Sequence, residues 1–413
     1  MTRLRFAYDI ACPFAYLAFR QLHRVRAHAE VELMPVLLGG LLRHVGAPDD
    51  PNTAMAPARA AINRRDITLW GALHGVPLRI PPEHPRRTVD AMRVLAAAPV
   101  PHREALTAAL YAAYWEDGVD VTDREVLAAR AAPFGLDAHA LIEAGREPLR
   151  SATQAAFEAG AFGVPSFLDG PRLLWGQDRI GLLLRDLGDP LPPEGWVGPA
   201  VTTSTSTTVT SLRFFHDVSS PFSYLASTQV ERIAAAYGHA VLWTPILLGA
   251  LFRTIGTPDV PLHAMNETRQ AYTRRDMHDW AQAWGVPLRF PSHFPLRSVL
   301  PLRAMLVEPA STAAIYRAAW GEDRRVDTPE ALCAVLTEVG LDGAAIVEQA
   351  SDPGIKAALR ENTERAVASG VCGVPTVEVT WNDGGRVLLW GQDRLVMLRA
   401  VLQGWVPPGR DGL

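Results

Sequence analysis

Apolar and polar positions follow the same succession of patterns twice along the chain. Each succession begins with a stretch rich in aromatic and β-branched residues, 4–10 (LRFAYDI) and 212–218 (LRFFHDV), which predicts a strand. In the first copy, residues 14–28 carry apolar side chains at helical spacing, and residues 31–38 predict a second strand. These patterns predict a β-α-β unit at the start of each half.

The rest of each half is predicted to be helical first and then to end in a hairpin. Residues 58–154 and 264–368 are Ala-rich and helix-like. A Gly-Val-Pro stretch, a hairpin and a final helix follow, and the first hairpin is expected to turn on Asp169-Gly170 as a type I′ pair. The predicted fold class is therefore α/β, a thioredoxin-like layout interrupted by a helical insertion in each half.

Several motifs recur in the same order and indicate a tandem duplication. The phrase DIACPFAYLA (9–18) is matched by DVSSPFSYLA (217–226), and LLWGQDR occurs verbatim from Leu173 and from Leu388. Between the copies lies a stretch rich in Pro and Gly and then in Thr and Ser, which predicts a linker. The expected domains are residues 1–195 and 209–413, joined by the linker 196–208.

Composition limits the possible functions of the chain. Its 413 residues are 48% hydrophobic and carry a formal net charge of −4, which gives no basic excess for binding nucleic acid. No apolar run is long enough for a transmembrane helix, and no secretory signal is expected at the start. The three cysteines lack the spacing of a disulfide framework or a metal site. We expect a cytoplasmic protein with no metal, nucleic-acid or membrane partner.

Cys12 and Ser220 occupy matching places before a proline at a predicted helix start. A thiol at such a place is expected to have a lowered pKa, and a serine hydroxyl there can donate a hydrogen bond to an anion such as a thiolate. The alternative is that Ser220 only caps the helix and that Cys12 is a small buried residue.

These motifs together resemble the 2-hydroxychromene-2-carboxylate isomerases and the kappa-class glutathione transferases, which have a DsbA-like thioredoxin fold. The resemblance rests on the aspartate that ends the first strand, Ser-Pro-Phe-Ser-Tyr-Leu, Gly-Val-Pro-Thr and Trp-Gly-Gln-Asp-Arg, and it covers each copy nearly end to end. It implies two tandem domains that pack as a pseudo-twofold dimer within one chain. It also implies glutathione, or another small thiol, as cofactor and a small electrophile as substrate.

The resemblance also implies a role for individual residues. Ser220 would hold the cofactor sulfur as thiolate, Val374 would offer its backbone before a cis Pro375, and Gln392 and Asp393 would hold the γ-glutamyl end. Arg269 stands where the family often has a lysine that contacts the cofactor. The corresponding residues of the first copy are Cys12, Val164, Pro165, Gln177, Asp178 and Arg59.

Three functional hypotheses remain open at this point. The first is a thiol-dependent isomerase or transferase in which the second copy is active. The second is a disulfide oxidoreductase that uses Cys12, although Ala15 and Ser223 stand where a resolving cysteine is expected. The third is that one copy is a non-catalytic scaffold. Gly-Val-Pro as an ordinary turn and WGQDR as a simple helix start are the alternatives for those motifs.

Other recurring residues are interpreted as structural. Trp70, Trp115, Trp280 and Trp320 are expected in the cores, and His216 is not expected to act as a base because Tyr8 takes its place in the first copy. The Arg-Arg-Asp stretches at 64–66 and 274–276 are expected to be a solvated helix face or an ion-pair cluster.

Overall fold

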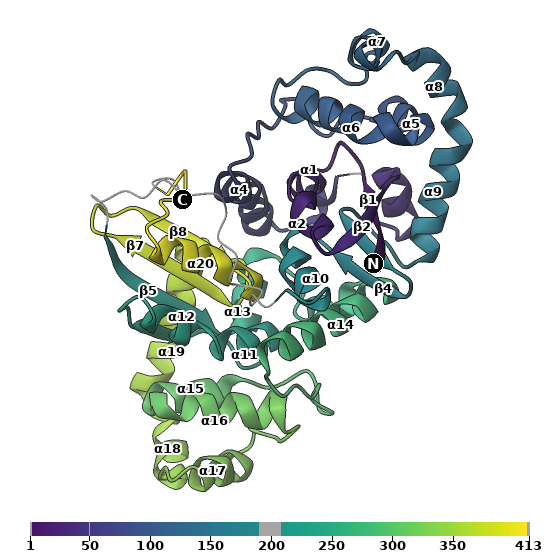
Figure 1. Cartoon of the computed structure of the whole chain (residues 1–413). Coiled ribbons are helices and arrows are strands. Elements are labelled where there is room, and N and C mark those ends of the chain that lie inside the picture. Colours follow the sequence, from purple (N-terminus) through teal and green to yellow (C-terminus); the bar gives the residue numbers. More distant parts are fainter. Residues whose placement is uncertain (1, 49, 190–207, 411–413) are drawn as a thin grey trace. The chain divides into compact units, whose positions relative to one another are not determined.

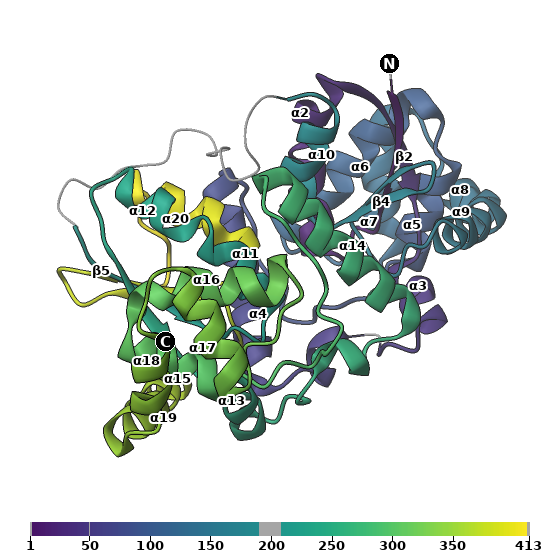
Figure 2. The same ribbon diagram turned by 90° about the horizontal axis from the view of Figure 1, so that it is seen from below.

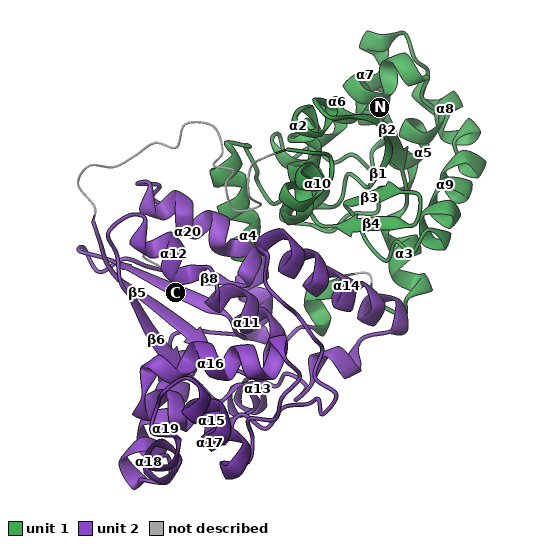
Figure 3. Cartoon of the chain, turned by 60° about the horizontal axis from the view of Figure 1, so that its bottom comes forward, with its two compact units in different colours: residues 1–54, 64–193 green, residues 55–63, 194–413 purple. Residues whose placement is uncertain are grey.

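The computed structural model describes residues 2–48, 50–189 and 208–410. The chain divides into two compact units, residues 1–54 with 64–193 and residues 55–63 with 194–413 (Figure 3). Residues 55–63 therefore group with the second unit, although they belong to the first sequence repeat. Except for Thr208, the predicted linker lies outside the described residues.

Each unit is built on a four-stranded mixed sheet of the same topology. The strand order is β2-β1-β3-β4 in the first unit and β6-β5-β7-β8 in the second. The first two strands of each unit pair in parallel, with Tyr8 opposite Pro35 and His216 opposite Pro245, and the other two pair antiparallel. This is the predicted β-α-β and β-β-α arrangement, and both copies have it.

The elements of the first unit follow the predicted order (Figure 1). The strands are β1 Thr2–Tyr8, β2 Ala29–Pro35, β3 Ser166–Asp169 and β4 Arg172–Trp175. The helices that accompany the sheet are α1 Pro13–Phe19, α2 Leu22–Arg26, α3 Leu38–His44, α9 Arg146–Glu158, η3 Gln177–Arg179 and α10 Ile180–Asp186. The insertion of the first repeat contains η1 Pro51–Ala54, α4 Pro57–His74, α5 Val89–Ala97, α6 Val100–Trp115, α7 Arg124–Ala131, η2 Ala132–Phe134 and α8 Ala138–Ala144. The start of α4, up to residue 63, groups with the second unit.

The second unit repeats this order with small changes in length. Its strands are β5 Val209–His216, β6 Val241–Pro245, β7 Thr376–Trp381 and β8 Arg386–Trp390. The helices around the sheet are α11 Pro221–Ser227, α12 Val230–Ala235, α13 Leu248–Ile255, α19 Pro353–Ala368, η8 Gln392–Arg394 and α20 Leu395–Leu402, with α12 beside α20 in Figure 1. The insertion contains η5 Pro261–Ala264, α14 Glu267–Trp284, α15 Val299–Val307, η6 Pro309–Ser311, α16 Thr312–Tyr316, the π-helical turn η7 Arg317–Gly321, α17 Pro329–Glu338 and α18 Gly343–Gln349.

The helix expected over residues 14–28 is broken into α1 and α2. The side-chain amide of Gln21 donates to the Leu17 carbonyl, and the Gln21 backbone N–H bonds the Ala18 carbonyl instead. Because the side chain takes the acceptor that a regular helix would give to the backbone, the helix ends here. The second copy has the same break, with the Gln229 N–H bonded to the Ala226 carbonyl.

The turn predicted for the first hairpin is also displaced by one residue. Asp169 pairs with Arg172, so the two-residue loop is Gly170-Pro171 and not Asp169-Gly170. A type I′ turn needs positive φ at both loop residues, which the ring of Pro171 forbids. Only Gly170 has a positive φ, +53°.

The tryptophans predicted to be structural are buried, and two of them join the insertion to the sheet. Trp115 and Trp320 are fully buried, and Trp70 and Trp280 are nearly so. The Trp115 indole N–H donates to the Ile10 carbonyl at 2.8 Å, and that of Trp320 donates to the Val218 carbonyl at 2.6 Å. Each bond fixes the turn that directly precedes Cys12 or Ser220, which satisfies a buried donor and positions the start of α1 or α11.

Within the described residues, the structure also bears on the predictions about membrane helices, metal sites, cysteines and the Arg-Arg-Asp stretches. No helix there is long and apolar enough to cross a membrane, and no group of three or more His, Cys, Asp and Glu side chains there is placed to hold a metal. None of the three cysteines, all of which lie within the described residues, forms a disulfide. In both Arg-Arg-Asp stretches the first arginine is exposed and the aspartate is buried, so each stretch is solvated only in part.

Candidate thiol-binding site

Ser220 is the N-cap of α11 and joins that helix to the loop before β7. Its backbone is extended, with φ −98° and ψ 120°, and its hydroxyl oxygen accepts the Ser223 N–H at 3.2 Å. The same hydroxyl donates to the Val374 carbonyl at 3.2 Å. The capping interpretation of Ser220 is therefore confirmed, and the hydroxyl also lies against the residue that the sequence paired with it.

The Gly373-Val374-Pro375 loop presents its main chain next to Ser220. Its peptide bond Val374-Pro375 is cis, as predicted, and so is Val164-Pro165 in the first copy. The Val374 side chain belongs to the hydrophobic core, which leaves the main chain to face Ser220. In the part of the chain that the structure describes, no group accepts the Val374 N–H, so one buried backbone donor is open to a ligand.

The glycine of this loop is explained by the tryptophan of the WGQDR motif. A Cβ on Gly373 would lie 2.9 Å from the Trp390 indole nitrogen, which is closer than real Cβ contacts allow. The Gly391 N–H also donates to the Pro375 carbonyl at 2.8 Å. Gly-Val-Pro and Trp-Gly therefore recur together because they pack on one another, which an isolated turn or helix start would not require.

Gln392 and Asp393 lie on η8, the short helix after Trp390, and η8 packs against α11. Gln392 is buried, and the Asp393 carboxylate pairs with Arg394 at 2.8 Å. Gly391 has a φ of +112°, which only glycine adopts readily, and so turns the chain from β8 into η8. The structure thus brings Ser220 and Val374 into contact and places Gln392 and Asp393 on the element beside them.

Asp217 fixes this arrangement and was noted in the sequence only as part of a motif. One carboxylate oxygen accepts the Ser219 N–H at 2.8 Å, and the other accepts the Leu248 N–H at 2.8 Å and the Ser298 hydroxyl at 3.1 Å. Asp217 therefore connects the turn before Ser220 with the starts of α13 and α15. Complete burial raises its pKa, and these hydrogen bonds oppose that rise.

Removing one of these bonds should weaken the second unit measurably. We expect Ser298→Ala to lower the free energy of unfolding by about 1 kcal/mol, because a buried carboxylate loses one donor. Denaturant titration at pH 7 measures this. Thr88→Val is the matched variant, since Thr88 donates to Asp9 at 2.7 Å in the first copy. Stability unchanged in both variants would contradict the role given to these aspartates.

Cys12 takes the place of Ser220 in the first copy, but its environment opposes ionisation. The thiol donates to the Val164 carbonyl at 3.3 Å, as Ser220 does to Val374. Burial raises the pKa of Cys12 to about 12, and the N–H groups of Ala15 and Phe14 counteract this only in part. The expectation of a lowered pKa is therefore wrong, because desolvation outweighs the effect of the helix start.

Gln177 of the first copy differs from its counterpart in its partners, whereas Asp178 does not. The Gln177 amide oxygen lies 3.2 Å from His74 Nε2 and 3.4 Å from the Gln21 amide nitrogen, so it is engaged within the protein. Trp284 stands at the place of His74 in the second copy, which removes that partner from Gln392. Asp178 pairs with Arg179 at 3.0 Å, as Asp393 does with Arg394.

Arg59 is not placed with the first copy's candidate site. It lies near the start of α4, in the segment 55–63 that groups with the second unit. Its guanidinium lies 5.4 Å from the centre of the Trp390 ring, the residue just before Gly391. The pKa of Arg269, also in the second unit, is lowered by burial first and then by the positive charge of Arg59. Two cations thus gather in the second unit, one of them from the first repeat.

Comparisons with known proteins identify the domain family of the chain. The family model of the DSBA-like thioredoxin domain matches residues 3–188 and again residues 211–403. The chain is 30% identical to the 2-hydroxychromene-2-carboxylate isomerase of Pseudomonas putida over 193 residues, 46% of this chain and 92% of that protein. It is 31% identical to the glutathione S-transferase kappa 1 of Rattus norvegicus over 218 residues, 48% of this chain and 93% of that protein.

One solved structure, that of a 2-hydroxychromene-2-carboxylate isomerase, is similar over 47% of this chain and 95% of its own, with 29% identity and a TM-score of 0.42. The relatives thus match about half of the chain each, whereas the family model matches both halves. The chain belongs to the DSBA-like thioredoxin domain family, carries that domain twice, and is similar to the isomerases and kappa-class transferases within it.

Proposed function

We propose that this protein is an enzyme that uses glutathione, or a similar small thiol, to isomerise or conjugate a small electrophilic substrate, and that the second copy is the active one. The names of its relatives, isomerases and glutathione transferases, support the reaction class. The observation that carries the proposal is the pairing of Ser220 with Val374: a hydroxyl donor beside a buried backbone N–H with no acceptor in the described chain.

The donors of the site suit a peptide-like thiol. Ser220 would donate to the sulfur, the Val374 main chain would pair with the backbone of the cysteinyl part, and the Asp393 carboxylate would hold the amine of the γ-glutamyl end beside Gln392. The basic Arg269 and Arg59 would favour a cofactor that carries carboxylates. Bound there, glutathione would supply a nucleophilic sulfur that adds to a conjugated double bond and can leave again.

The hydrogen bond that the Ser220 hydroxyl accepts from the Ser223 N–H orients it for this role. Because the Ser223 N–H occupies a lone pair of the hydroxyl oxygen, the hydroxyl hydrogen is directed away from the helix, and the Val374 carbonyl accepts it. A sulfur anion is a stronger acceptor than a neutral carbonyl. The hydroxyl would therefore turn its hydrogen to a thiolate and stabilise the charged form at neutral pH, without itself changing protonation.

The other two hypotheses fare differently. Disulfide exchange at Cys12 needs a thiolate, and the raised pKa of Cys12 together with Ala15 at the resolving position disfavours it. A supporting role for the first copy fits the raised pKa of Cys12 and the engaged Gln177. We further propose a cytoplasmic enzyme of aromatic catabolism, in which the two halves pair within one chain.

Calorimetry with glutathione tests the proposal. We expect one glutathione to bind per chain, and its analogue with a methyl group in place of the thiol to bind more weakly. Asp393→Asn should weaken both ligands by the same factor, about tenfold, because its carboxylate recognises the amine and not the sulfur. Absence of binding by any small thiol, or equal affinity of the thiol and its methyl analogue, would overturn the proposal.

A further inference from the structure

A groove of about 580 Å³ lies on the second unit between α13, α15 and α19. These helices pack on one another and lie together in Figure 2. The apolar residues that line the groove are Leu247, Ala250, Val299, Leu359, Val367 and Ala368. Its polar lining includes three cations, Arg303, Lys356 and Arg360, and one carboxylate, Glu364.

The apolar lining of the groove is partly exposed and rests on the core of the second unit. Val299 is a large hydrophobic residue with 37% of its surface exposed, and Val367 packs on the core cluster of the second unit. Exposed apolar surface inside a concave site favours a ligand with an apolar body.

The cations of the groove are not neutralised. In the described part of the chain, neither Arg303 nor Lys356 has an ion-pair partner, and the buried Nε of Arg303 has no hydrogen-bond acceptor. Arg360 has only Glu364, at 3.9 Å, with both side chains largely exposed. Three positive charges against one negative charge leave the groove with a net charge of about +2.

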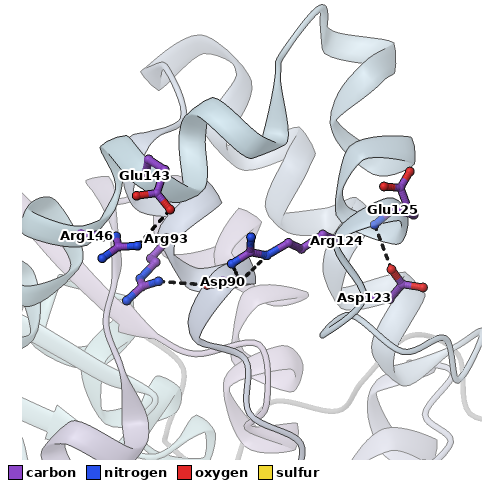
Figure 4. A network of polar contacts seen from close by, with 7 residues as sticks. All are labelled: Asp90, Arg93, Asp123, Arg124, Glu125, Glu143 and Arg146. Atoms are coloured by element: carbon purple, nitrogen blue, oxygen red, sulfur yellow. Dashed lines mark hydrogen bonds and ion pairs between the residues drawn. The ribbon is translucent and has the colours of Figure 1, made fainter.

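The first copy has the same cations, each paired with an acid. Leu37 donates its N–H to Thr153 as Leu247 does to Thr363, which fixes the correspondence of the two regions. Arg93 pairs with Asp90 at 3.0 Å and Arg146 with Glu143 at 3.0 Å (Figure 4), and Arg150 pairs with Glu147 at 2.8 Å. These arginines correspond to Arg303, Lys356 and Arg360 of the second copy.

The second copy has lost all three acids while it keeps the cations. Leu300, Pro353 and Ala357 stand at the positions of Asp90, Glu143 and Glu147. The first copy's counterpart also has Phe157 in place of Val367, and this ring lies 4.4 Å from that of His44. In the second copy alone, these differences leave the cations without their acidic partners and put a smaller side chain in the lining of the groove.

We propose that this groove binds a small organic anion with an apolar body, such as a carboxylate or sulfonate on an aromatic or alkyl group. The apolar body would cover Val299, Leu359 and Val367, and the anionic group would pair with Arg303 and Lys356. This site is independent of the thiol site, since neither Ser220 nor Asp393 lines it.

A property of the sequence gives a direct test. Lys356 is the single lysine of the chain, so reductive methylation with 13C-formaldehyde labels only this side chain and the N-terminal amine, and keeps the positive charge. Naphthalene-1-sulfonate is then titrated into the full chain and followed by NMR. We expect a saturable shift of the Lys356 signal, with at least tenfold weaker binding of the neutral naphthalene-1-sulfonamide.

Variants complete the test. Arg303→Gln should weaken binding of the sulfonate at least tenfold, and Val299→Glu, at an exposed position, should abolish the shift. Arg93→Gln is the matched control in the first copy and should leave the affinity unchanged. No shift of the Lys356 signal at millimolar sulfonate, an equal shift with the sulfonamide, or full affinity in both Arg303→Gln and Val299→Glu would overturn the proposal.

Discussion

Replacing Ser220 by alanine is expected to reduce glutathione-dependent turnover by about 100-fold or more. The side chain donates to the Val374 carbonyl at 3.2 Å, and its removal leaves the sulfur without a hydroxyl partner. Loss of one preorganised donor to a developing or stored anion costs about 10²–10³ in rate in comparable sites. The affinity for the methyl analogue of glutathione should change little, because that ligand has no thiolate to stabilise.

The measurement is kcat/KM for glutathione with a simple electrophile such as 1-chloro-2,4-dinitrobenzene. Cys12→Ala is the matched variant at the same place in the first copy and should keep near-wild-type activity. If Cys12→Ala is the variant that loses activity while Ser220→Ala keeps it, the first copy is the active one and the assignment is wrong.

Acid is expected to destabilise the second unit through His216. Burial lowers the pKa of His216 from 6.5 to about 3, so the folded unit holds the imidazole neutral. Between these two pH values the unfolded chain binds a proton that the folded unit does not bind, so stability falls as the pH falls through this window. At pH 4 the loss amounts to about 3 kcal/mol. Asp217, whose pKa is raised, acts in the opposite sense and gains stability as the pH falls.

The first copy shows how this side chain can be replaced. Tyr8 stands at the place of His216 and hydrogen-bonds Thr107 at 2.7 Å, and Thr312 is the counterpart of Thr107. Trp243 lies 5.2 Å from His216, and Leu33 stands at its place in the first copy. We therefore combine His216→Tyr with Trp243→Leu in a double variant.

Denaturant titrations followed by circular dichroism at pH 7 and pH 4 give the comparison. From pH 7 to pH 4, the unfolding free energy of the wild type should fall by about 3 kcal/mol more than that of the double variant. His263→Gln, at an exposed position, is the control and should leave the pH dependence unchanged. A pH dependence that is the same in the double variant and the wild type would contradict the buried, neutral state of His216.

The duplication and the order of elements could be predicted because they depend on local patterns that are written twice. The cis isomers of Pro165 and Pro375 were implied by the family resemblance. The contact between Ser220 and Val374 could also be anticipated, since both lie in motifs that the resemblance joins. Two further peptide bonds, His84-Pro85 and Phe294-Pro295, are also cis, and no sequence motif indicated this.

What the sequence could not provide depends on surroundings assembled from distant parts of the chain. The pKa of Cys12 is set by complete burial, which the local helix start does not reveal. Arg59 joins the second unit because the start of α4 groups there, whereas the repeat assigns it to the first. The free charge of Arg303 is visible only when its paired counterpart Arg93 is compared with it in three dimensions.

The central claim is tested most directly by the ionisation of the bound thiol. The thiolate of glutathione absorbs short-wavelength ultraviolet light more strongly than the thiol does, so a pH titration of the complex reports the pKa of the sulfur. We predict that binding to the wild type lowers this pKa from about 8.5 to below 7, and that Ser220→Ala returns it toward the free value. A bound thiol that remains protonated at pH 7 in the wild type, or a lowered pKa that survives in Ser220→Ala, would contradict the account.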